Sequence, residues 1–332
     1  MSISKARLNA ALHEPLELPQ EEGSLEELKP EDFYPRPETP PFPMALDNTI
    51  ISTFRECPQK AFRSYFQHLA PSTTSIHLIA GAAYAAGLEA ARNAFYLHGA
   101  TPTRAKAVGV ITLLKSWGDY DPHWGQPKGL DLMVLALWET LDYWPLGEDI
   151  VAPLEYGDRN GVEFSFALPI GVDHPTTGEP ILYTGRIDML CIYEQALFAE
   201  DDKTTGQLGA TWTRQWDLRA QFTGYCWALR EYNLPAAGTL VRGTSIQKLG
   251  NKHATAIVYQ PDWKIDRWLR QTRRDINRMI ECWREGYWDF NLGDSCTAFG
   301  GCPFKDLCNS ANPERLIPTN FVERVWDPLI KT

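Results

Sequence analysis

The sequence predicts an α/β protein, because stretches with helical periodicity and stretches with strand periodicity both recur along it. Four runs rich in β-branched, aromatic and aliphatic residues follow one another between residues 150 and 203, which is typical of strands. Over residues 262–288 apolar residues recur every three to four positions, which predicts a long amphipathic helix. With 332 residues the chain can bury a sizeable core.

The first 45 residues are predicted to form a flexible arm rather than a packed element. Residues 1–43 carry nine acidic and four basic residues, a net charge of −5, which is half of the −10 of the whole chain. Eight prolines lie in the same stretch, and such a segment buries too little apolar surface to fold by itself. We expect a plain tail or an arm that docks on a protein partner, followed by a single domain over residues 46–332.

The composition is that of an ordinary globular protein, with 44% hydrophobic and 22% charged residues. No apolar run is long enough to cross a bilayer, and the N-terminus lacks the apolar core of a signal peptide. We therefore expect a cytoplasmic protein with no membrane partner, whose seven cysteines are reduced. The sequence does not specify an oligomeric state.

Helices are expected before the strands. Ser52 is a suitable N-cap, but Pro58 follows inside the same pattern, so the first helix begins either at Ser52 or after Cys57 with proline in its first turn. Three further helices are expected over His77–Leu97, Thr103–Trp117 and Leu130–Trp144. The last two lie in a helical insertion that we place at residues 103–147.

The second half of the chain alternates strands and helices. The predicted strands are Ile150–Tyr156, Val162–Ile170, Ile181–Tyr193 and Ala196–Lys203. A helix over about Thr211–Tyr232, a strand pair at Thr239–Gln247 and Ala254–Tyr259, and the long helix Asp262–Trp288 follow.

The hairpin over residues 185–203 is the most informative stretch. If its turn is centred on Glu194 and Gln195, Asp188 faces Asp201, and side chains that face each other across a hairpin have Cβ atoms about 5 Å apart. Two carboxylates at that separation can share a divalent cation, which prefers hard oxygen ligands. Glu-Gln is not a strong turn sequence, so a slipped register that leaves the two acids diagonal stays open.

Lys203 lies on the same face of its strand as Asp201, whereas Asp202 points to the other face. An ammonium beside two metal-binding acids can orient an attacking water and offset negative charge that develops on a phosphate. We therefore expect substitution of Asp202 to be nearly silent. The alternative is a surface hairpin with a solvated run of charges.

The long helix near the C-terminus has a basic stripe opposite its apolar side. The stripe consists of Arg267, Arg270, Arg274 and Arg278, with Lys264 beside it. A basic stripe on an acidic protein suits the phosphate backbone of DNA. A solvated face, partly neutralised by Asp266 and Asp275, explains the pattern equally well.

The hairpin and the helix after it carry a family resemblance. The run GRID at residues 185–188, then Asp201-x-Lys203 and Gln221-x-x-x-Tyr225, resembles the PD-(D/E)XK nuclease superfamily. It is most similar to the branch with the RecB and AddB nuclease domains and the CRISPR-associated RecB-like exonucleases. The resemblance implies a restriction-endonuclease-like core, a mixed central sheet flanked by helices, and a DNA nuclease that uses Mg²⁺ or Mn²⁺.

The resemblance also implies the roles of individual residues. The catalytic set would be Asp188, Asp201, Lys203, Gln221 and Tyr225. Asp188 and Asp201 would bind the metal ion. Members of the family often have a histidine four residues after a glycine on the first core helix, and here that position is Ala85. Glu89, one turn later, matches an acid of the family and could take over as a metal ligand.

Several members of that branch hold a 4Fe–4S cluster with one upstream cysteine and three near the C-terminus. This chain has the same layout, with Cys57 upstream and Cys296, Cys302 and Cys308 in the segment 289–310. The resemblance therefore implies a cluster that joins the N- and C-terminal parts of the domain. A structural Zn²⁺ on the same four cysteines is the alternative.

We expect a metal-dependent DNA nuclease, specifically an exonuclease that hydrolyses phosphodiester bonds in DNA processing or recombination. Two other functions stay open. One is a non-catalytic DNA-binding or recombination-assembly protein on a decayed nuclease fold, which Ala85 favours. The other is a restriction-type endonuclease with a structural zinc.

Overall fold

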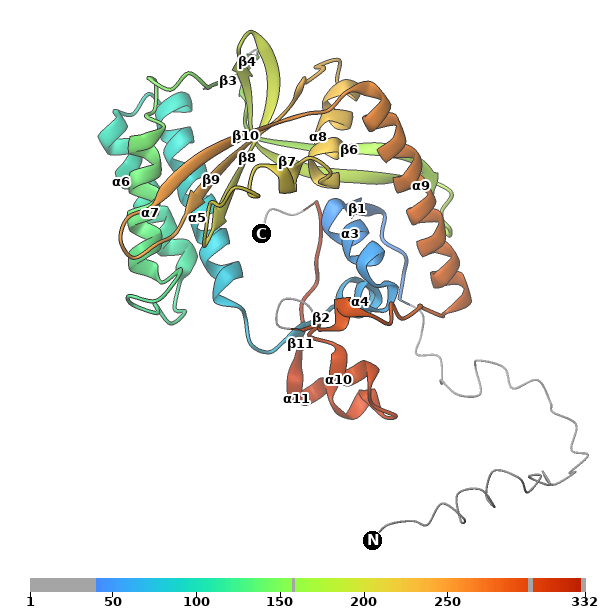
Figure 1. Cartoon of the computed structure of the whole chain (residues 1–332). Helices are drawn as coiled ribbons and strands as arrows, with labels where there is room; N and C mark the ends of the chain where they lie inside the picture. The colour runs from blue at the N-terminus through green and yellow to red at the C-terminus, as the bar shows by residue number, and fades with distance from the viewer. Residues whose placement is uncertain (1–39, 157–158, 298–300, 330–332) are drawn as a thin grey trace, which may run out of the picture. The chain divides into compact units, whose positions relative to one another are not determined.

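The computed structural model describes residues 40–156, 159–297 and 301–329 (Figure 1). Most of the predicted arm, residues 1–39, lies outside the described residues. The last residues of the predicted arm are packed, because Phe42 is buried in the main core and Ala45–Asp47 forms the first strand, β1. One compact unit spans Pro40–Thr332, so it begins a few residues before the predicted boundary.

A mixed sheet forms the centre of the domain, as predicted, and in the described residues it has seven strands. The strands β1, β7, β8, β9 and β10 follow one another across it, and β3 and β6 also pair with β7. β1 runs parallel to β7 and β8 parallel to β9, whereas β6–β7, β7–β8 and β9–β10 are antiparallel. The remaining bounds are β3 Ala152–Pro153, β6 Val162–Asp173, β7 Pro180–Tyr193, β8 Ala196–Thr205, β9 Gly238–Ser245 and β10 Lys252–Tyr259.

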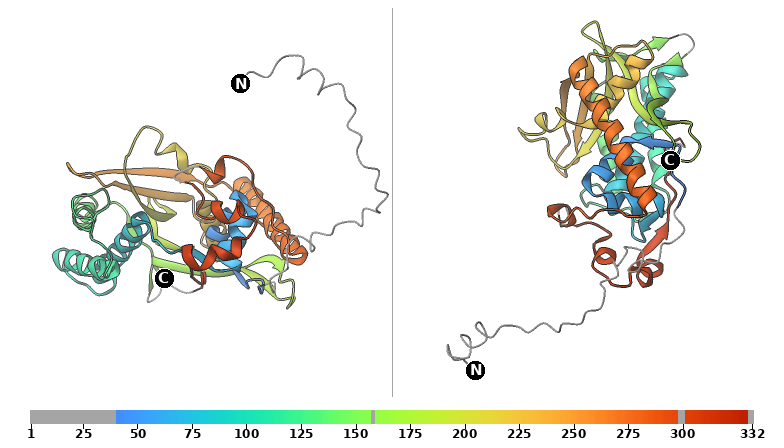
Figure 2. Two further views of the ribbon diagram at one scale, coloured as in Figure 1. Left: turned by 90° about the horizontal axis from the view of Figure 1, so that it is seen from below. Right: turned by 90° about the vertical axis from the view of Figure 1, so that its right-hand side faces the viewer.

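Three helices cover one face of this sheet and enclose the main core. They are α3 Asn48–Glu56, α8 Ala220–Glu231 and α9 Asp262–Glu285. The predicted apolar side of α9 is buried, and its Trp268 packs edge-on against Tyr183 of β7 with ring centres 5.2 Å apart. Figure 2 shows α9 lying along this side of the molecule in its right-hand view.

A second helical layer lies over the β8–β9 part of the sheet (Figure 1). It consists of α5 Ile76–Arg92, which continues in a π-helical turn over Asn93–Leu97, with α6 Pro102–Trp117 and α7 Leu130–Tyr143. α5 and α6 cross at Gly87 and Gly109, where a Cβ on either residue would lie within 2.9 Å of the other's carbonyl oxygen. Small residues therefore allow the two backbones to approach closely. The helices predicted over Thr103–Trp117 and Leu130–Trp144 are confirmed as α6 and α7.

The first helices differ in detail from the prediction. α3 begins at Asn48 because Asp47, not Ser52, is its N-cap, and Asp47 accepts a hydrogen bond from the backbone N–H of Ile50 at 2.8 Å. The next helix, α4, spans Pro58–Ala61 with Cys57 as its N-cap and passes into a π-helical turn at Phe62–Phe66. Proline at the first helical position thus separates two helices.

The C-terminal segment returns to the beginning of the domain. β11 Phe321–Glu323 pairs with β2 Leu69–Pro71, and Trp326 donates a hydrogen bond to Asp47 at 3.0 Å. The short helices α10 Lys305–Cys308 and α11 Ile317–Asn320 lie beside this pair (Figure 1). Short 3₁₀ turns occur at Arg214–Trp216, Asp294–Cys296 and Pro313–Arg315, and a small separate strand pair joins β4 Glu155–Tyr156 to β5 Arg159–Asn160. None of the described helices is both long and apolar enough to span a lipid bilayer.

Candidate active site

The β7–β8 hairpin adopts the predicted register. Glu194 and Gln195 form its two-residue turn, both with positive φ, 47° and 64°. Positive φ at both central positions suits the right-handed twist of a hairpin, although neither residue favours it. Pairing runs from the turn to Met189 opposite Glu200, so Asp188 and Asp201 are the next residues in register.

Asp201 lies at the centre of a contact network on the α8 side of the sheet. Its carboxylate forms an ion pair with Lys203, two residues along β8. Gln221, in the first turn of α8, donates to Asp201 at 3.2 Å and contacts the Tyr225 hydroxyl at 2.6 Å. The structure therefore brings together Asp201, Lys203, Gln221 and Tyr225.

Asp188 joins this group through the neighbouring strand. Its Oδ2 atom accepts a hydrogen bond from the backbone N–H of Asp202 at 2.8 Å. Burial raises the pKa of Asp188 well above 3.8, and the carboxylates of Asp201 and Asp202 raise it further. Burial also raises the pKa of Asp201, against the effect of the nearby Lys203 ammonium. The half-buried Asp188 and the buried Asp201 are therefore close enough for the charge of Asp201 to act on Asp188.

The pKa values of the two other titratable groups of the site, Lys203 and Tyr225, are also shifted. Burial lowers the pKa of Lys203, but the carboxylates of Asp201 and Asp188 outweigh it, so that the pKa is raised and the ammonium is kept charged. Burial raises the pKa of Tyr225 well above 10, so its phenol is neutral. The site thus holds a fixed positive charge beside two carboxylates.

Replacing Asp188 with asparagine is expected to stabilise the metal-free protein at neutral pH. The folded protein holds the Asp188 proton more tightly than the unfolded chain does. The contribution of this group to the free energy of unfolding is therefore fully present below pH 3.8 and is lost as pH rises through the raised pKa. Asparagine keeps the acceptor for Asp202 but removes the charge. Thermal unfolding in EDTA should show Tm higher by about 2–4 °C for each kcal/mol of repulsion relieved.

The matched control for this measurement is Glu179→Gln, which changes an exposed acid immediately before β7. The advantage of the Asp188→Asn protein should vanish near pH 3.5, where Asp188 is protonated in folded and unfolded chains alike. An Asp188→Asn protein that matches the wild type in Tm at both pH values would contradict the repulsion between Asp188 and Asp201.

Glu89 lies half-buried on α5, one turn before Arg92, whose side chain contacts β8. Ala85, at the position of the family's histidine, is exposed on the same helix. In the part of the chain that the structure describes, no three His, Cys, Asp or Glu side chains are grouped so that they could hold a metal ion. That holds both for the hairpin acids and for the cysteines.

The expectation that substitution of Asp202 is nearly silent stays a prediction, but the side chain is not solvated. Its side chain does point away from Asp201, but it is only 7% exposed and forms an ion pair with Arg92 at 2.7 Å. Sequence reasoning also missed Glu200, which is completely buried and contacts the same arginine. The run of three acids at 200–202 was the available signal, since the alternation of a strand places Glu200 and Asp202 on one face.

The four cysteines of the predicted cluster gather near the β2–β11 pair. Cys57, Cys296 and Cys302 are half-buried and Cys308 is exposed. Burial raises the pKa of Cys308 to about 11, and Cys302, Cys57 and Cys296 contribute to the rise. Asn291 donates to the carbonyl of Glu56 at 2.6 Å, which ties the C-terminal cysteine segment to the turn that carries Cys57. Residues 298–300 of that segment lie outside the described residues.

The other three cysteines, Cys191, Cys226 and Cys282, are buried.

The basic stripe of α9 is exposed along its whole length, on the side of the helix away from the sheet. Arg278 forms an ion pair with Asp289 at 3.0 Å.

Several known proteins show similarity to this chain in structure or sequence. The chain is similar to the solved structure of SSO0001, with 13% identity over 68% of this chain and 84% of that chain and a TM-score of 0.31. It is also similar to a candidate exonuclease from Eubacterium rectale, with 12% identity over 81% of this chain and 92% of that chain and a TM-score of 0.42. No curated protein shows significant similarity. The family model of the PD-(D/E)XK nuclease superfamily matches residues 48–309, most of the compact unit, and the chain belongs to that superfamily.

Proposed function

We propose that the protein is a DNA exonuclease of the RecB/AddB-like branch, which hydrolyses phosphodiester bonds with Mg²⁺ or Mn²⁺ during DNA processing or recombination. The observation that supports this most is the position of Asp201. It follows directly after the last paired residues of the hairpin, as Asp188 precedes them, and it forms an ion pair with Lys203 and accepts a hydrogen bond from Gln221. Three elements of the resemblance, on β7, β8 and α8, thus meet near one carboxylate.

Asp188 and Asp201 would hold the metal ion. Glu89 of α5 is proposed as a third ligand, although in the described residues it is not grouped with the two aspartates. The donor set fits, because carboxylate oxygens are the ligands that Mg²⁺ and Mn²⁺ prefer. The carboxylate of Asp201 raises the pKa of Asp188, and a divalent cation between two such acids would stabilise their charged forms. A bound divalent cation would polarise the scissile phosphate and lower the pKa of a coordinated water.

The remaining side chains act on substrate and water. Lys203 stays charged beside Asp201, so its ammonium can orient the attacking water and offset charge that develops on the phosphate. Gln221 fixes the orientation of the Asp201 carboxylate and is itself held by Tyr225. This bracing matters because small displacements of catalytic groups lower the rate strongly.

Cys57, Cys296, Cys302 and Cys308 are proposed to ligate a structural 4Fe–4S cluster. Burial raises the pKa of Cys302 and Cys308, and Lys60 and Arg63, respectively, oppose that rise, so two cations stand near the thiols that would bind the metal as thiolates. Zn²⁺ on the same thiolates is the alternative, and it would join the N- and C-terminal parts of the domain in the same way.

The stripe Arg267, Arg270, Arg274 and Arg278 is proposed to contact DNA phosphates. Changing Arg270 and Arg274 together to alanine should lower the slope of log K against log salt by about two units without changing sequence preference. Fluorescence anisotropy at several salt concentrations measures this slope. Arg284→Ala, which removes an exposed arginine of α9 outside the stripe, should leave the slope unaltered. Equal slopes in the double variant and the wild type would assign the stripe to solvent.

Cleavage of end-labelled linear DNA and closed circular DNA, with and without Mn²⁺, tests the proposed function. An exonuclease degrades the linear DNA from its ends and spares the circle. Cutting of the circle would instead indicate a restriction-type endonuclease. Binding of both DNAs without cleavage under any metal would indicate the non-catalytic protein that Ala85 left open.

A further inference from the structure

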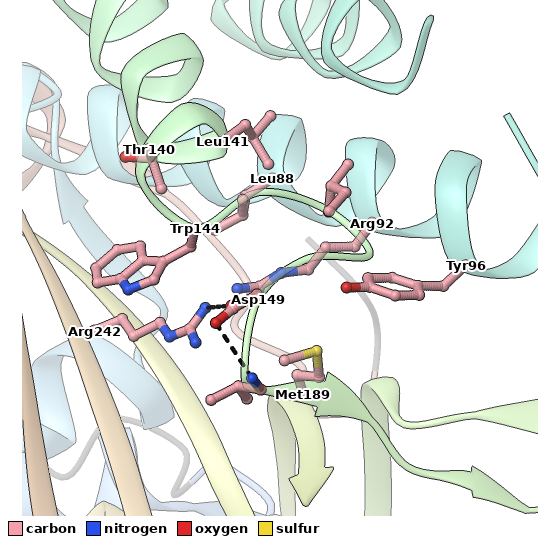
Figure 3. Close-up of a pocket in the computed structure, with 11 residues that line it drawn as sticks. Leu88, Arg92, Tyr96, Thr140, Leu141, Trp144, Asp149, Met189 and Arg242 are labelled. Carbon is pink, nitrogen blue, oxygen red and sulfur yellow. Dashed lines mark hydrogen bonds and ion pairs between the residues drawn. The ribbon is translucent and has the colours of Figure 1, made fainter. Parts of the chain in front are cut away.

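Behind the candidate active site, buried charged side chains of alternating sign form a continuous chain. Asp202 pairs with Arg92 at 2.7 Å, and Arg92 also contacts Glu200. Glu200 lies 3.6 Å from Arg242, which pairs with Asp149 at 2.6 Å. All five side chains are at most 8% exposed. In Figure 3, Arg92 reaches in from α5 and Arg242 from β9.

This buried chain is not a second ligand pocket. The cavity that Arg92, Arg242 and Asp149 help to line measures about 10 Å³, which is no more than the space of one water molecule. Trp144 closes it from the side, with its ring 4.7 Å from the Arg242 guanidinium. The arrangement must therefore act on groups that are already part of the protein.

A buried ionic network is poor stabilisation by itself, because desolvation of the charges offsets most of their attraction. Here three carboxylates face two guanidinium groups, so one negative charge is left over close to the acids of the site. Apolar side chains of the same volume would stabilise the core equally well. The network is thus better explained by a role in positioning a neighbouring group of the candidate active site.

The link to the site runs through Asp202. Its side chain is held by Arg92, and its backbone N–H donates to Asp188 Oδ2 at 2.8 Å. A peptide group held in this way fixes the direction of that N–H. Arg92 can hold Asp202 and Glu200 at once because a guanidinium presents several donors in a rigid fork.

We propose that Arg92 is a positioning residue for the catalytic metal site: through Asp202 it holds Asp188 in the orientation that binds the ion. The inference rests on the proposed function for the identity of the ion. Arg92 touches neither substrate nor metal in this mechanism. Loss of an outer partner of a metal ligand typically lowers metal affinity 10–100-fold, which sets the scale of the expected effect.

Calorimetric titration of Mn²⁺ into DNA-free protein tests this proposal without reference to cleavage. Arg92→Met should weaken Mn²⁺ binding by at least about tenfold, and Arg92→Lys, which keeps the charge but not the fork, should fall between it and the wild type. Arg242→Met is the matched control, because it removes an equally buried arginine of the same network that does not contact Asp202. It should lower Tm, as Arg92→Met does, but leave Mn²⁺ affinity within about twofold.

A double-mutant cycle with Asp202→Asn tests the route of the effect. Asparagine keeps the backbone N–H but loses the ion pair, so it should weaken Mn²⁺ binding as Arg92→Met does, and the double variant should be no weaker than either single one. If Arg92→Met does not fold, Arg92→Lys and Asp202→Asn carry the comparison. Additive effects, or an equal loss of affinity in Arg242→Met, would overturn the proposal.

The proposed nuclease function and the proposed role of Arg92 can be refuted by different results. A wild-type protein that binds Mn²⁺ but cleaves no DNA would refute the proposed nuclease function while the binding comparison stands. A wild-type protein that cleaves DNA, with Arg92→Lys and Asp202→Asn unaltered in Mn²⁺ affinity, would refute the role of Arg92 alone.

Discussion

Asp201→Asn is expected to lower the rate of DNA cleavage by on the order of a thousandfold, the upper range for loss of one preorganised electrostatic group. The substitution removes the carboxylate charge that pairs with Lys203, accepts from Gln221 and acts on Asp188. Asparagine has nearly the same shape, and DNA binding depends on basic side chains elsewhere, so folding and DNA affinity should persist. Single-turnover cleavage of end-labelled DNA at saturating Mn²⁺ measures the rate, and anisotropy measures the affinity.

Lys203→Met should give a loss of similar size for a different reason, because it leaves the metal ligands in place and removes the ammonium. The control is Glu194→Gln at the tip of the same hairpin, far along both strands from the acids. It should cleave at the wild-type rate. An Asp201→Asn protein that keeps more than about a tenth of the wild-type rate would exclude this carboxylate as a metal ligand.

The second large effect is expected at the cysteines. Replacing Cys57, Cys296, Cys302 or Cys308 singly with serine should abolish the bound cluster, which in the anaerobically purified wild type amounts to about four iron and four sulfide per chain. The chain should then unfold at a lower temperature and aggregate, because the binding free energy of a structural metal centre appears as folding free energy. Iron and sulfide assays, visible absorbance and thermal unfolding measure the outcome.

Cys226→Ser and Cys282→Ser are the controls, since both thiols are buried away from the β2–β11 region and belong to the main core. They should retain full iron content, whatever they do to stability. A colourless wild type with one zinc per chain would replace the cluster with the zinc alternative. A wild-type protein that contains no bound metal and is only as stable as its four serine variants would refute a structural metal centre at these cysteines.

Elements whose pattern is local could be predicted from the sequence. The apolar side of α9 and the alternation of β7 and β8 depend only on spacing along the chain, so the long helix and the hairpin register were both predicted correctly. The predicted helix over Thr211–Tyr232 was too long at its start. Trp212 and Trp216 are four residues apart as in a helix, yet α8 begins only at Ala220. Trp212 instead packs against Gly243 of β9, where a Cβ would meet its ring at 2.2 Å.

Contacts between distant segments could not be predicted. Arg92 and Asp202 are 110 residues apart, and nothing in the sequence near either residue specifies the other. The N-cap of α3 shows the same limit on a smaller scale. Ser52 and Asp47 are both good caps, and the choice falls on Asp47 because β1 pairs with β7 up to that residue and ends there.

The return of the C-terminal segment to the start of the domain has a consequence for synthesis of the chain. Trp326 is 279 residues from the Asp47 side chain to which it donates, and β2 likewise gains its partner only with β11 at Phe321–Glu323. At about 5–20 residues per second, translation of that interval takes roughly 14–56 s. In the later part of this time the nascent chain already contains Asp188, Asp201 and Lys203, but the first segment of its domain has not yet met the last. Completion of the fold therefore waits until β11 and Trp326 have emerged from the ribosome, and products of translation interrupted before them are expected to be cleared by proteases.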